Sequence, residues 1–348
     1  MSPDHWEYNS TNTEFVEHNG VISLHIKSLG KPALYKDQKF LNGTIEYDID
    51  PQDDLLNGIY FRAADVENAE YFYLRPDKAS IPNSIEAIQY APTIKGLTYW
   101  TLLPHYQSAA NFKRNTWNHI KLVVSGDQML VYVNDMNKPS LVIPKLEGNF
   151  GAGFIAFNGT GYISNIIIKP NITEGLSPVA GLDLTLNDPR FLRNWKYTDP
   201  VNLQKGREPI SSEIPKEDVS WKSITAENCG LINFSRLYNR SQNRRMIWLK
   251  VTLLSPVDQI RFLNVGFSDE IWGFVNDEIA FSDKNIYFEP VKKDPEGRVS
   301  IQNGKYRLPL KTGENKLVIA LANNYFGWGL IARLDSMEGI QIVEQEKP

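Results

Sequence analysis

The stretch Gly43-Thr44-Ile45-Glu46-Tyr47-Asp48-Ile49-Asp50 alternates between apolar and acidic side chains. Because successive side chains of a β-strand point to opposite faces, Ile45, Tyr47 and Ile49 share one face and the three acids share the other. A strand with this pattern is half-buried, with its apolar face toward a core. The segment therefore predicts a sheet that covers a hydrophobic core and carries acidic side chains on its other face.

The same period of two continues along most of the chain. Residues 120–124 and 129–133 are apolar-rich runs separated by the turn Ser125-Gly126-Asp127-Gln128, which predicts a β-hairpin. No segment of twelve or more residues has a convincing helical period. Short strands divided by Gly, Asn and Asp are typical of sandwiches and barrels, so we expect an all-β fold. Further strands are expected at 153–157, 162–168, 246–253, 259–266, 316–321 and 329–334.

The length of 348 residues exceeds the ~250–300 residues at which single hydrophobic cores stop growing, so two domains are expected. Between residues 173 and 220 the strand patterns give way to a proline-rich, polar segment. Proline restricts its own backbone and that of its neighbour, which suits an extended connector. The sequence predicts two β-sandwich (jelly-roll) domains at 1–172 and 221–348, joined by a connector and domain-docking segment at 173–220.

Charge and composition exclude several classes of partner. The net charge of −4 and the scattered Lys and Arg argue against nucleic acid, because a phosphate backbone requires a basic surface. No run of eighteen apolar residues is present, so no membrane span is expected. Cys229 is the only cysteine, which excludes an internal disulfide. Residues 1–6 lack a signal-peptide pattern, so we expect a secreted or periplasmic location if a signal was removed and a cytoplasmic one otherwise.

Residues 40–170 resemble the concanavalin A-like, laminin-G-like sandwich of many bacterial carbohydrate-associated proteins. The resemblance rests on Asn57-Gly58-Ile59-Tyr60-Phe61-Arg62, on the run from Thr116-Trp117-Asn118 to Val124, and on Ile163-Ser164-Asn165-Ile166-Ile167-Ile168. It implies a lectin-like or glucanase-like sandwich with a carbohydrate or glycoside as its ligand.

Residues 221–343 resemble the galactose-binding-like jelly roll that accompanies many glycosidases. Here the resemblance rests on Val265-Gly266-Phe267-Ser268-Asp269, Val275-Asn276-Asp277-Glu278 and Phe326-Gly327-Trp328-Gly329, with the run from Leu308 to Asn315. Sandwiches carry many unrelated functions, so both resemblances imply the fold more strongly than an activity.

Aromatic rings and planar hydrogen-bonding groups are concentrated between Arg62 and Tyr106. A pyranose face stacks on an aromatic ring, while guanidinium and amide groups bind its hydroxyls. We therefore expect a carbohydrate in a cleft of the N-terminal sandwich; the alternative is that the rings only pack the sandwich, with Arg75 and Glu86 as a surface pair. The predicted ligand-binding residues are Arg62, Tyr71, Tyr73, Arg75, Gln89, Tyr90, Trp100 and His105.

Alternation orders part of this set. If residues 71–75 form a strand, Tyr71, Tyr73 and Arg75 point outward, and the residues between them point into the core. Two rings and a guanidinium on one outward face are more than a solvated strand requires.

Catalytic groups are less well defined. The acids Glu46, Asp48 and Asp50 resemble the Glu-x-Asp-x-x-Glu pattern of laminarinase-like enzymes, but Pro51 occupies its last position, so a solvated acidic face is the alternative. Glu86 and His105 are the remaining catalytic candidates; His105 lies in an expected loop, where functional residues concentrate.

No cofactor is expected, and the histidines show no metal-ligand spacing. Calcium is the one metal worth considering, because both resembled folds often hold it through loop carboxylates and carbonyls. The candidate ligands are Asp269 and Asp277.

Three functions follow from these observations. The first is a carbohydrate-binding two-domain protein, the second a glycoside hydrolase or lyase acting in the same cleft, and the third a non-catalytic protein-interaction module. The oligomeric state is left open by the sequence.

Overall fold

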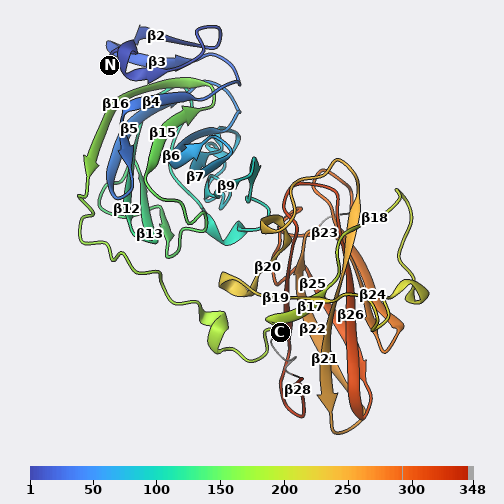
Figure 1. Ribbon diagram of the computed structural model, residues 1–348. Coiled ribbons are helices and arrows are strands. Elements are labelled where there is room, and N and C mark those ends of the chain that lie inside the picture. Colours follow the sequence, from blue (N-terminus) through green and yellow to red (C-terminus); the bar gives the residue numbers. More distant parts are fainter. Residues whose placement is uncertain (292, 344–348) are drawn as a thin grey trace. The chain divides into compact units, whose positions relative to one another are not determined.

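The computed structural model describes residues 1–291 and 293–343. The chain divides into two compact units, Met1–Leu182 and Asp183–Pro348 (Figure 1). Across the described residues each unit is built from antiparallel strands and short 3-10 helices, and no α-helix occurs. The all-β fold class predicted from the sequence is confirmed.

The first unit contains a sheet of nine strands in the order β1-β4-β15-β6-β7-β8-β11, with β9 beside β7 and β10 beside β9, all within the described part of the chain. We call it the nine-stranded sheet. Its strands are β1 (Trp6–Glu7), β4 (Ala33–Phe40), β6 (Asn57–Asp65), β7 (Asn68–Leu74), β8 (Ile88–Tyr90), β9 (Thr93–Ile94), β10 (Leu97–Thr98), β11 (Gln107–Ser108) and β15 (Gly153–Asn158).

The second sheet of this unit has seven strands among the described residues, in the order β14-β13-β12-β5-β16-β3-β2. These are β2 (Thr13–His18), β3 (Val21–Ile26), β5 (Gly43–Pro51), β12 (Asn118–Ser125), β13 (Gln128–Val133), β14 (Leu141–Ile143) and β16 (Gly161–Pro170). The predicted hairpin is confirmed, because β12 and β13 pair from Ile120–Val133 to Ser125–Gln128.

The core of the first unit lies between its two sheets. The apolar face of β5 is fully buried, with Ile45, Tyr47 and Ile49 at most 2% exposed. The ring of Tyr47 meets the ring of Phe157 from β15 edge to face, at a centroid distance of 5.0 Å. The period-two pattern of residues 43–50 therefore identified the buried face of this strand correctly.

The second unit is also a pair of sheets. In its described part, one sheet has eight strands, with β19-β17-β21-β26-β23-β24 in order and β18 and β28 also paired to β21, and the other has four in the order β20-β27-β22-β25. The eight are β17 (Asn194–Tyr197), β18 (Val201–Asn202), β19 (Lys222–Thr225), β21 (Arg245–Ser255), β23 (Asp269–Val275), β24 (Glu278–Asn285), β26 (Gly313–Asn323) and β28 (Gln341–Ile342). The four are β20 (Ile232–Asn233), β22 (Gln259–Phe267), β25 (Gly304–Leu310) and β27 (Gly329–Leu334).

The segment treated as a connector in the sequence contributes to this second unit. Its strands β17 and β18 both pair with β21. Residues 203–221, which we call the strap, run along the outer face of the eight-stranded sheet. Leu203, Ile214 and Trp221 of the strap pack on an apolar cluster that includes Trp248 and Trp272.

The helices are all single turns of 3-10 helix. They are η1 (Pro3–His5), η2 (Pro76–Lys78), η3 (Pro104–Tyr106), η4 (Leu184–Asn187), η5 (Ser211–Glu213), η6 (Asn228–Gly230) and η7 (Phe234–Arg236). Within the described residues, none has the length and apolar character needed to cross a membrane.

Candidate functional site

Three tyrosines stack in a ladder on the nine-stranded sheet of the first unit. The rings of Tyr60 and Tyr71 lie 4.3 Å apart and nearly parallel, and those of Tyr71 and Tyr73 lie 4.9 Å apart. With Ala91 and the half-buried Trp100, they form an apolar cluster of their own. We call these residues the tyrosine ladder.

Strand geometry explains how the ladder forms. Tyr60 of β6 lies directly opposite Tyr71 of β7, and Gly58 lies opposite Tyr73. A side chain on Gly58 would collide with the ring of Tyr71, because a Cβ there would lie 2.3 Å from Cε2 of that ring. The glycine is therefore what allows Tyr71 to lean across β6 and stack.

A buried hydrogen-bond network borders the ladder. The Gln89 Oε1 atom accepts hydrogen bonds from the Tyr73 hydroxyl at 2.7 Å, from Arg75 Nη2 at 2.5 Å and from Gln107 Nε2 at 3.0 Å. Gln89 Nε2 in turn donates to the carbonyl oxygen of Trp100 at 2.9 Å. The guanidinium of Arg75 also lies over the ring of Tyr73, 4.9 Å from its centroid. Four of the predicted ligand-binding residues thus form one connected cluster.

Two phenols of the ladder, those of Tyr60 and Tyr71, are held as neutral hydrogen-bonding groups. Burial raises the pKa of Tyr60 to about 12, and it raises the pKa of Tyr71 well above its usual range. The Tyr71 hydroxyl donates to Asn158 Oδ1 at 3.0 Å, and Asn158 Nδ2 donates to the Tyr60 hydroxyl at 3.2 Å. Tyr60 and Asn158 were not among the predicted residues, although the period of two places Tyr60 on the face opposite Ile59 and Phe61.

Tyr71, Tyr73 and Arg75 were expected on one outward face of the strand, but that face is covered. All three are buried, with Tyr73 only 2% exposed. They do lie on the face opposite Phe72 and Leu74, as the alternation predicted. Stacking against neighbouring rings and the contacts to Gln89 remove them from water, which a single-strand pattern cannot show.

Tyr90 points into the sandwich rather than toward the ladder. Its hydroxyl donates to Glu70 Oε2 at 2.6 Å and accepts from the backbone N–H of Glu147 at 2.7 Å. Glu70 is fully buried, and burial raises its pKa to about 7, against the opposing effects of the Tyr90 hydrogen bond and the charge of Arg62. The Tyr90 hydroxyl is thus engaged by Glu70 and Glu147, and a contact of Tyr90 with a ligand stays a prediction.

Arg62 is buried and holds chain segments together. Its Nε donates to the carbonyl oxygen of Leu41 at 2.7 Å, and its Nη2 donates to Asn42 Oδ1 at 3.0 Å and to the carbonyl oxygen of Gly126 at 2.7 Å. The register of β6 shifts between Phe61 and Asp65, so simple alternation does not apply at this residue. These contacts give Arg62 a structural role.

The two catalytic candidates, Glu86 and His105, lie on separate segments of the first unit. Arg75 Nη1 donates to the backbone carbonyl of Glu86 at 2.8 Å, whereas the Glu86 carboxylate lies 3.8 Å from Lys78 Nζ. The expected surface pair of Arg75 and Glu86 side chains is therefore replaced by a backbone contact. His105 is exposed in η3, and its ring packs against Tyr106 at 4.1 Å.

The acidic face of β5 is paired rather than simply solvated. His119 Nδ1 lies 2.7 Å from Asp48 Oδ1, Lys169 Nζ lies 2.7 Å from Glu46, and His18 Nε2 lies 2.8 Å from Asp50. The hydrogen bond from Lys169 holds the pKa of Glu46 below its usual range. A carboxylate committed to a lysine in this way is stabilised in its charged form, which does not suit a general acid.

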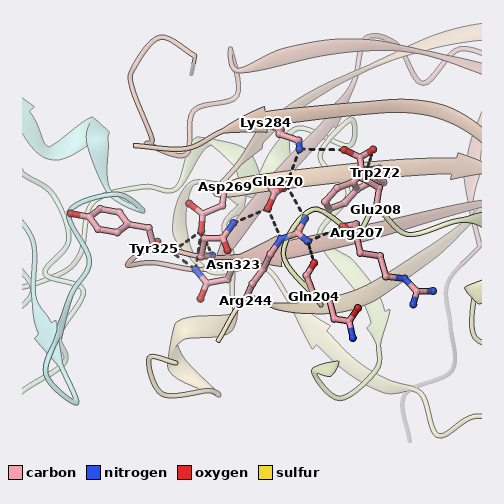
Figure 2. A network of polar contacts seen from close by, with 11 residues as sticks. Gln204, Arg207, Glu208, Arg244, Asp269, Glu270, Trp272, Lys284, Asn323 and Tyr325 are labelled. Carbon is pink, nitrogen blue, oxygen red and sulfur yellow. Dashed lines mark hydrogen bonds and ion pairs between the residues drawn. The ribbon is translucent and has the colours of Figure 1, made fainter. Parts of the chain in front are cut away.

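The two predicted calcium ligands cannot share one ion. Asp269 begins β23 and Asp277 follows its end, so they lie at opposite ends of the strand. The Asp269 Oδ2 atom accepts hydrogen bonds from the backbone N–H groups of Asn324 and Tyr325 and from Asn323 Nδ2 (Figure 2). Among the described residues, no group of three or more His, Cys, Asp or Glu side chains is arranged to hold a metal ion. Calcium binding stays a prediction.

Residues 2–169 match the model of the 3-keto-alpha-glucoside-1,2-lyase-like domain. This segment includes the tyrosine ladder and the Gln89 network. A search of curated proteins returned no match.

Several solved structures resemble part of the chain. A carbohydrate-binding module (CBM66) from Bacillus subtilis is 15% identical with a TM-score of 0.32, covering 48% of this chain and 92% of its own. A putative glycosyl hydrolase from Parabacteroides distasonis is 14% identical with a TM-score of 0.36, covering 48% and 94%. Chicken galectin 2 is 12% identical with a TM-score of 0.28, covering 38% and 98%. Likenesses this weak carry no argument about function, and the concanavalin A-like and galactose-binding-like assignments stay predictions.

Proposed function

We propose that the first unit binds a carbohydrate or glycoside at the tyrosine ladder. The observation that carries the proposal is the stack of Tyr60, Tyr71 and Tyr73, which forms a cluster apart from the main core. The stack lies beside the side-chain amide of Gln89 and the guanidinium of Arg75, which are hydrogen-bonded to each other. Stacked rings of this kind offer an apolar platform for a pyranose face, and the buried polar groups at its border hold the rings in position. The match of residues 2–169 to a domain family described by a glucoside supports the same ligand class.

In the ladder and the Gln89 network beside it, the roles of the residues differ with their burial. Tyr60 and Trp100 are half-buried, so their surfaces are the ones offered to a sugar, whereas Tyr73, Arg75 and Gln89 are buried and hold the platform in place. The binding groups are therefore pre-organised before the ligand arrives, which reduces the entropy lost on binding.

The test is calorimetric titration and thermal melting of the full chain with a panel of oligosaccharides and glycosides, with and without calcium. A ligand that binds only the native state must raise the melting temperature. We expect Tyr60→Ala and Trp100→Ala to weaken binding at least about tenfold, which is ~1.4 kcal/mol. Tyr162→Ala is the matched control, because Tyr162 is a half-buried tyrosine on β16 of the other sheet. A panel without any thermal shift would favour the interaction-module alternative.

A second candidate function is a glycoside lyase or hydrolase. It is favoured by the description of the matching family, which names a lyase acting on a 3-keto-α-glucoside. Incubation with a 3-keto-α-glucoside, followed by product analysis, separates this function from binding alone. Loss of product in Glu86→Gln or His105→Ala would support the enzyme, and a melting shift without any product would support binding only.

A further inference from the structure

A cavity of about 740 Å³ lies at one end of the eight-stranded sheet in the second unit. Its wall brings together residues at four strand ends, with Arg244 before β21, Glu270 near the start of β23, Lys284 near the end of β24 and Asn324 after β26. Cavities of ~300–1,000 Å³ are the usual size for small-molecule sites.

The floor of this cavity is a buried, bidentate ion pair between Arg244 and Glu270. Arg244 Nε donates to Glu270 Oε1 at 2.7 Å, and Arg244 Nη2 donates to Glu270 Oε2 at 2.9 Å (Figure 2). The Glu270 side chain is only 4% exposed and that of Arg244 only 10%. Arg244 Nη1 also donates to the strap carbonyls of Gln204 and Arg207, each at 2.7 Å. The guanidinium therefore ties the strap to the sheet.

A buried ion pair of this kind contributes little net stability, because the desolvation of both charges offsets their attraction. Its effect here is geometric, since it fixes the floor and the strap wall of the cavity relative to each other. A wall that is fixed before binding is a property of binding sites, where groups must be in place when the ligand arrives.

The charges of the floor nearly cancel. Lys284 Nζ lies 3.3 Å from Glu270 and 3.2 Å from Glu208, so its charge is shared between two carboxylates (Figure 2). Asn324 Nδ2 donates to Glu270 Oε1 at 2.7 Å, which leaves the Asn324 carbonyl oxygen for other donors. A floor with balanced charge has no net attraction for an anion or a cation, which favours a neutral ligand.

The rim carries four amides, beside the exposed and oppositely charged Lys205 and Glu289. Asn202, Gln204, Gln242 and Asn243 all line the cavity and are exposed. Among the described residues, no hydrogen bond involves their side-chain amides. An amide both donates and accepts, as does a hydroxyl, so a ring of amides over a neutral polar floor matches a molecule with several hydroxyls.

We infer that this cavity is a second binding site, whose ligand is a neutral polyhydroxylated molecule of the hexopyranoside class. The site belongs wholly to the second unit and does not depend on the tyrosine ladder. The rim amides bind hydroxyls, Asn324 and Lys284 bind from the floor, and Arg244 positions the strap.

The test is a nuclear magnetic resonance titration of the ¹⁵N-labelled full chain with methyl α-D-glucopyranoside and methyl β-D-galactopyranoside. Side-chain amide signals are assigned by their loss in Gln204→Ala, Gln242→Ala and Asn243→Ala. We expect saturable shifts of these signals with at least one of the two glycosides, and a fivefold or greater weakening in the double variant Gln204→Ala/Asn243→Ala. These exposed positions do not threaten the fold. The matched control is the exposed Gln302, whose signal should not move.

Two results would overturn the inference. One is the absence of saturable shifts at the rim amides with both glycosides, and the other is a larger response of these signals to inorganic phosphate. The same titration of Tyr60→Ala separates this site from the tyrosine ladder, because that variant should lose only the first unit's response. If the ladder does not bind a carbohydrate, the shifts of the rim amide signals should still be seen. If the cavity in the second unit does not bind one, the response of the first unit should still be seen.

Discussion

The ring of Tyr71 fills the space beside Gly58 on the nine-stranded sheet, because a Cβ on Gly58 would lie 2.3 Å from that ring. The stack of Tyr60, Tyr71 and Tyr73 therefore depends on a residue that has no side chain. A strand interior normally disfavours glycine, and close approach of another group is a usual reason for finding it there.

Gly58→Ala should separate the tyrosine ladder. We expect a loss of stability of about 1–3 kcal/mol, typical of overpacking, together with a loss of carbohydrate binding. Urea titration and calorimetry measure the two effects. Gly151→Ala is the matched control, because a Cβ at Gly151 meets nothing within 4 Å. Full binding by Gly58→Ala would show that the stacked arrangement is not the binding platform.

Arg75→Ala should lower the free energy of unfolding by more than the loss of an exposed arginine does. It removes the hydrogen bonds that the charged guanidinium donates to Gln89 Oε1, to the Tyr73 hydroxyl and to the Glu86 carbonyl oxygen, and a hydrogen bond to a charged group contributes about 1.5–3 kcal/mol. Arg114→Ala removes an exposed pair with Asp54 and should cost at most about 1 kcal/mol. Chemical denaturation compares the two variants, and equal losses would contradict a supporting role for Arg75.

The buried Glu70 should make the protein less stable as pH rises. Its pKa is raised from 4.5 to about 7 in the folded state, so the folded protein holds this proton more tightly than the unfolded chain. The stabilisation is complete below about pH 4.5 and is lost as pH rises through about 7, an effect on the order of 3 kcal/mol.

Glu70→Gln tests this directly, because glutamine keeps the shape and cannot ionise. We expect the urea midpoint of the wild type to fall between about pH 5 and pH 8 by more than that of Glu70→Gln. Parallel pH profiles for the two proteins would show that Glu70 keeps the same proton affinity on unfolding. Tyr90→Phe, which removes the hydrogen bond to Glu70, should raise the pKa further and steepen the profile.

Local patterns in the sequence predicted the strands well and their partners poorly. The alternation of residues 43–50 placed Ile45, Tyr47 and Ile49 in the core, and the turn at 125–128 located the β12–β13 hairpin. The alternation lies within one strand, and the turn joins two strands that are consecutive in the sequence. Both follow from local backbone geometry, so they can be predicted without knowing the other strands of the sheet.

The site was harder to predict because its contacts join distant parts of the chain. The tyrosine ladder is completed by Asn158, which is 87 residues from Tyr71, and no local pattern links the two. Tyr90 was predicted only as one of the ligand-binding residues, because the three-residue strand β8 is too short for its alternation to show which face the ring takes. The floor of the cavity in the second unit needs Arg244, just before β21, and Glu270 of β23, which are 26 residues apart at strands that are not neighbours.

Asp269 should act as a cap for the turn after β26 rather than as a calcium ligand. Its Oδ2 atom accepts from the N–H groups of Asn324 and Tyr325, and burial raises its pKa to about 7. A protonated or fully hydrogen-bonded carboxylate is a poor ligand for Ca²⁺, which prefers charged oxygens.

We therefore expect that neither added Ca²⁺ nor a chelator changes the melting temperature of the wild type. Asp269→Asn should lower the melting temperature, because the amide accepts less strongly from the two N–H groups. Asp277→Asn, at the far end of β23, is the control and should leave it unchanged. A rise with Ca²⁺ that disappears in Asp269→Asn would instead make this carboxylate a calcium ligand, and the turn at 323–327 would then be the loop that the ion organises.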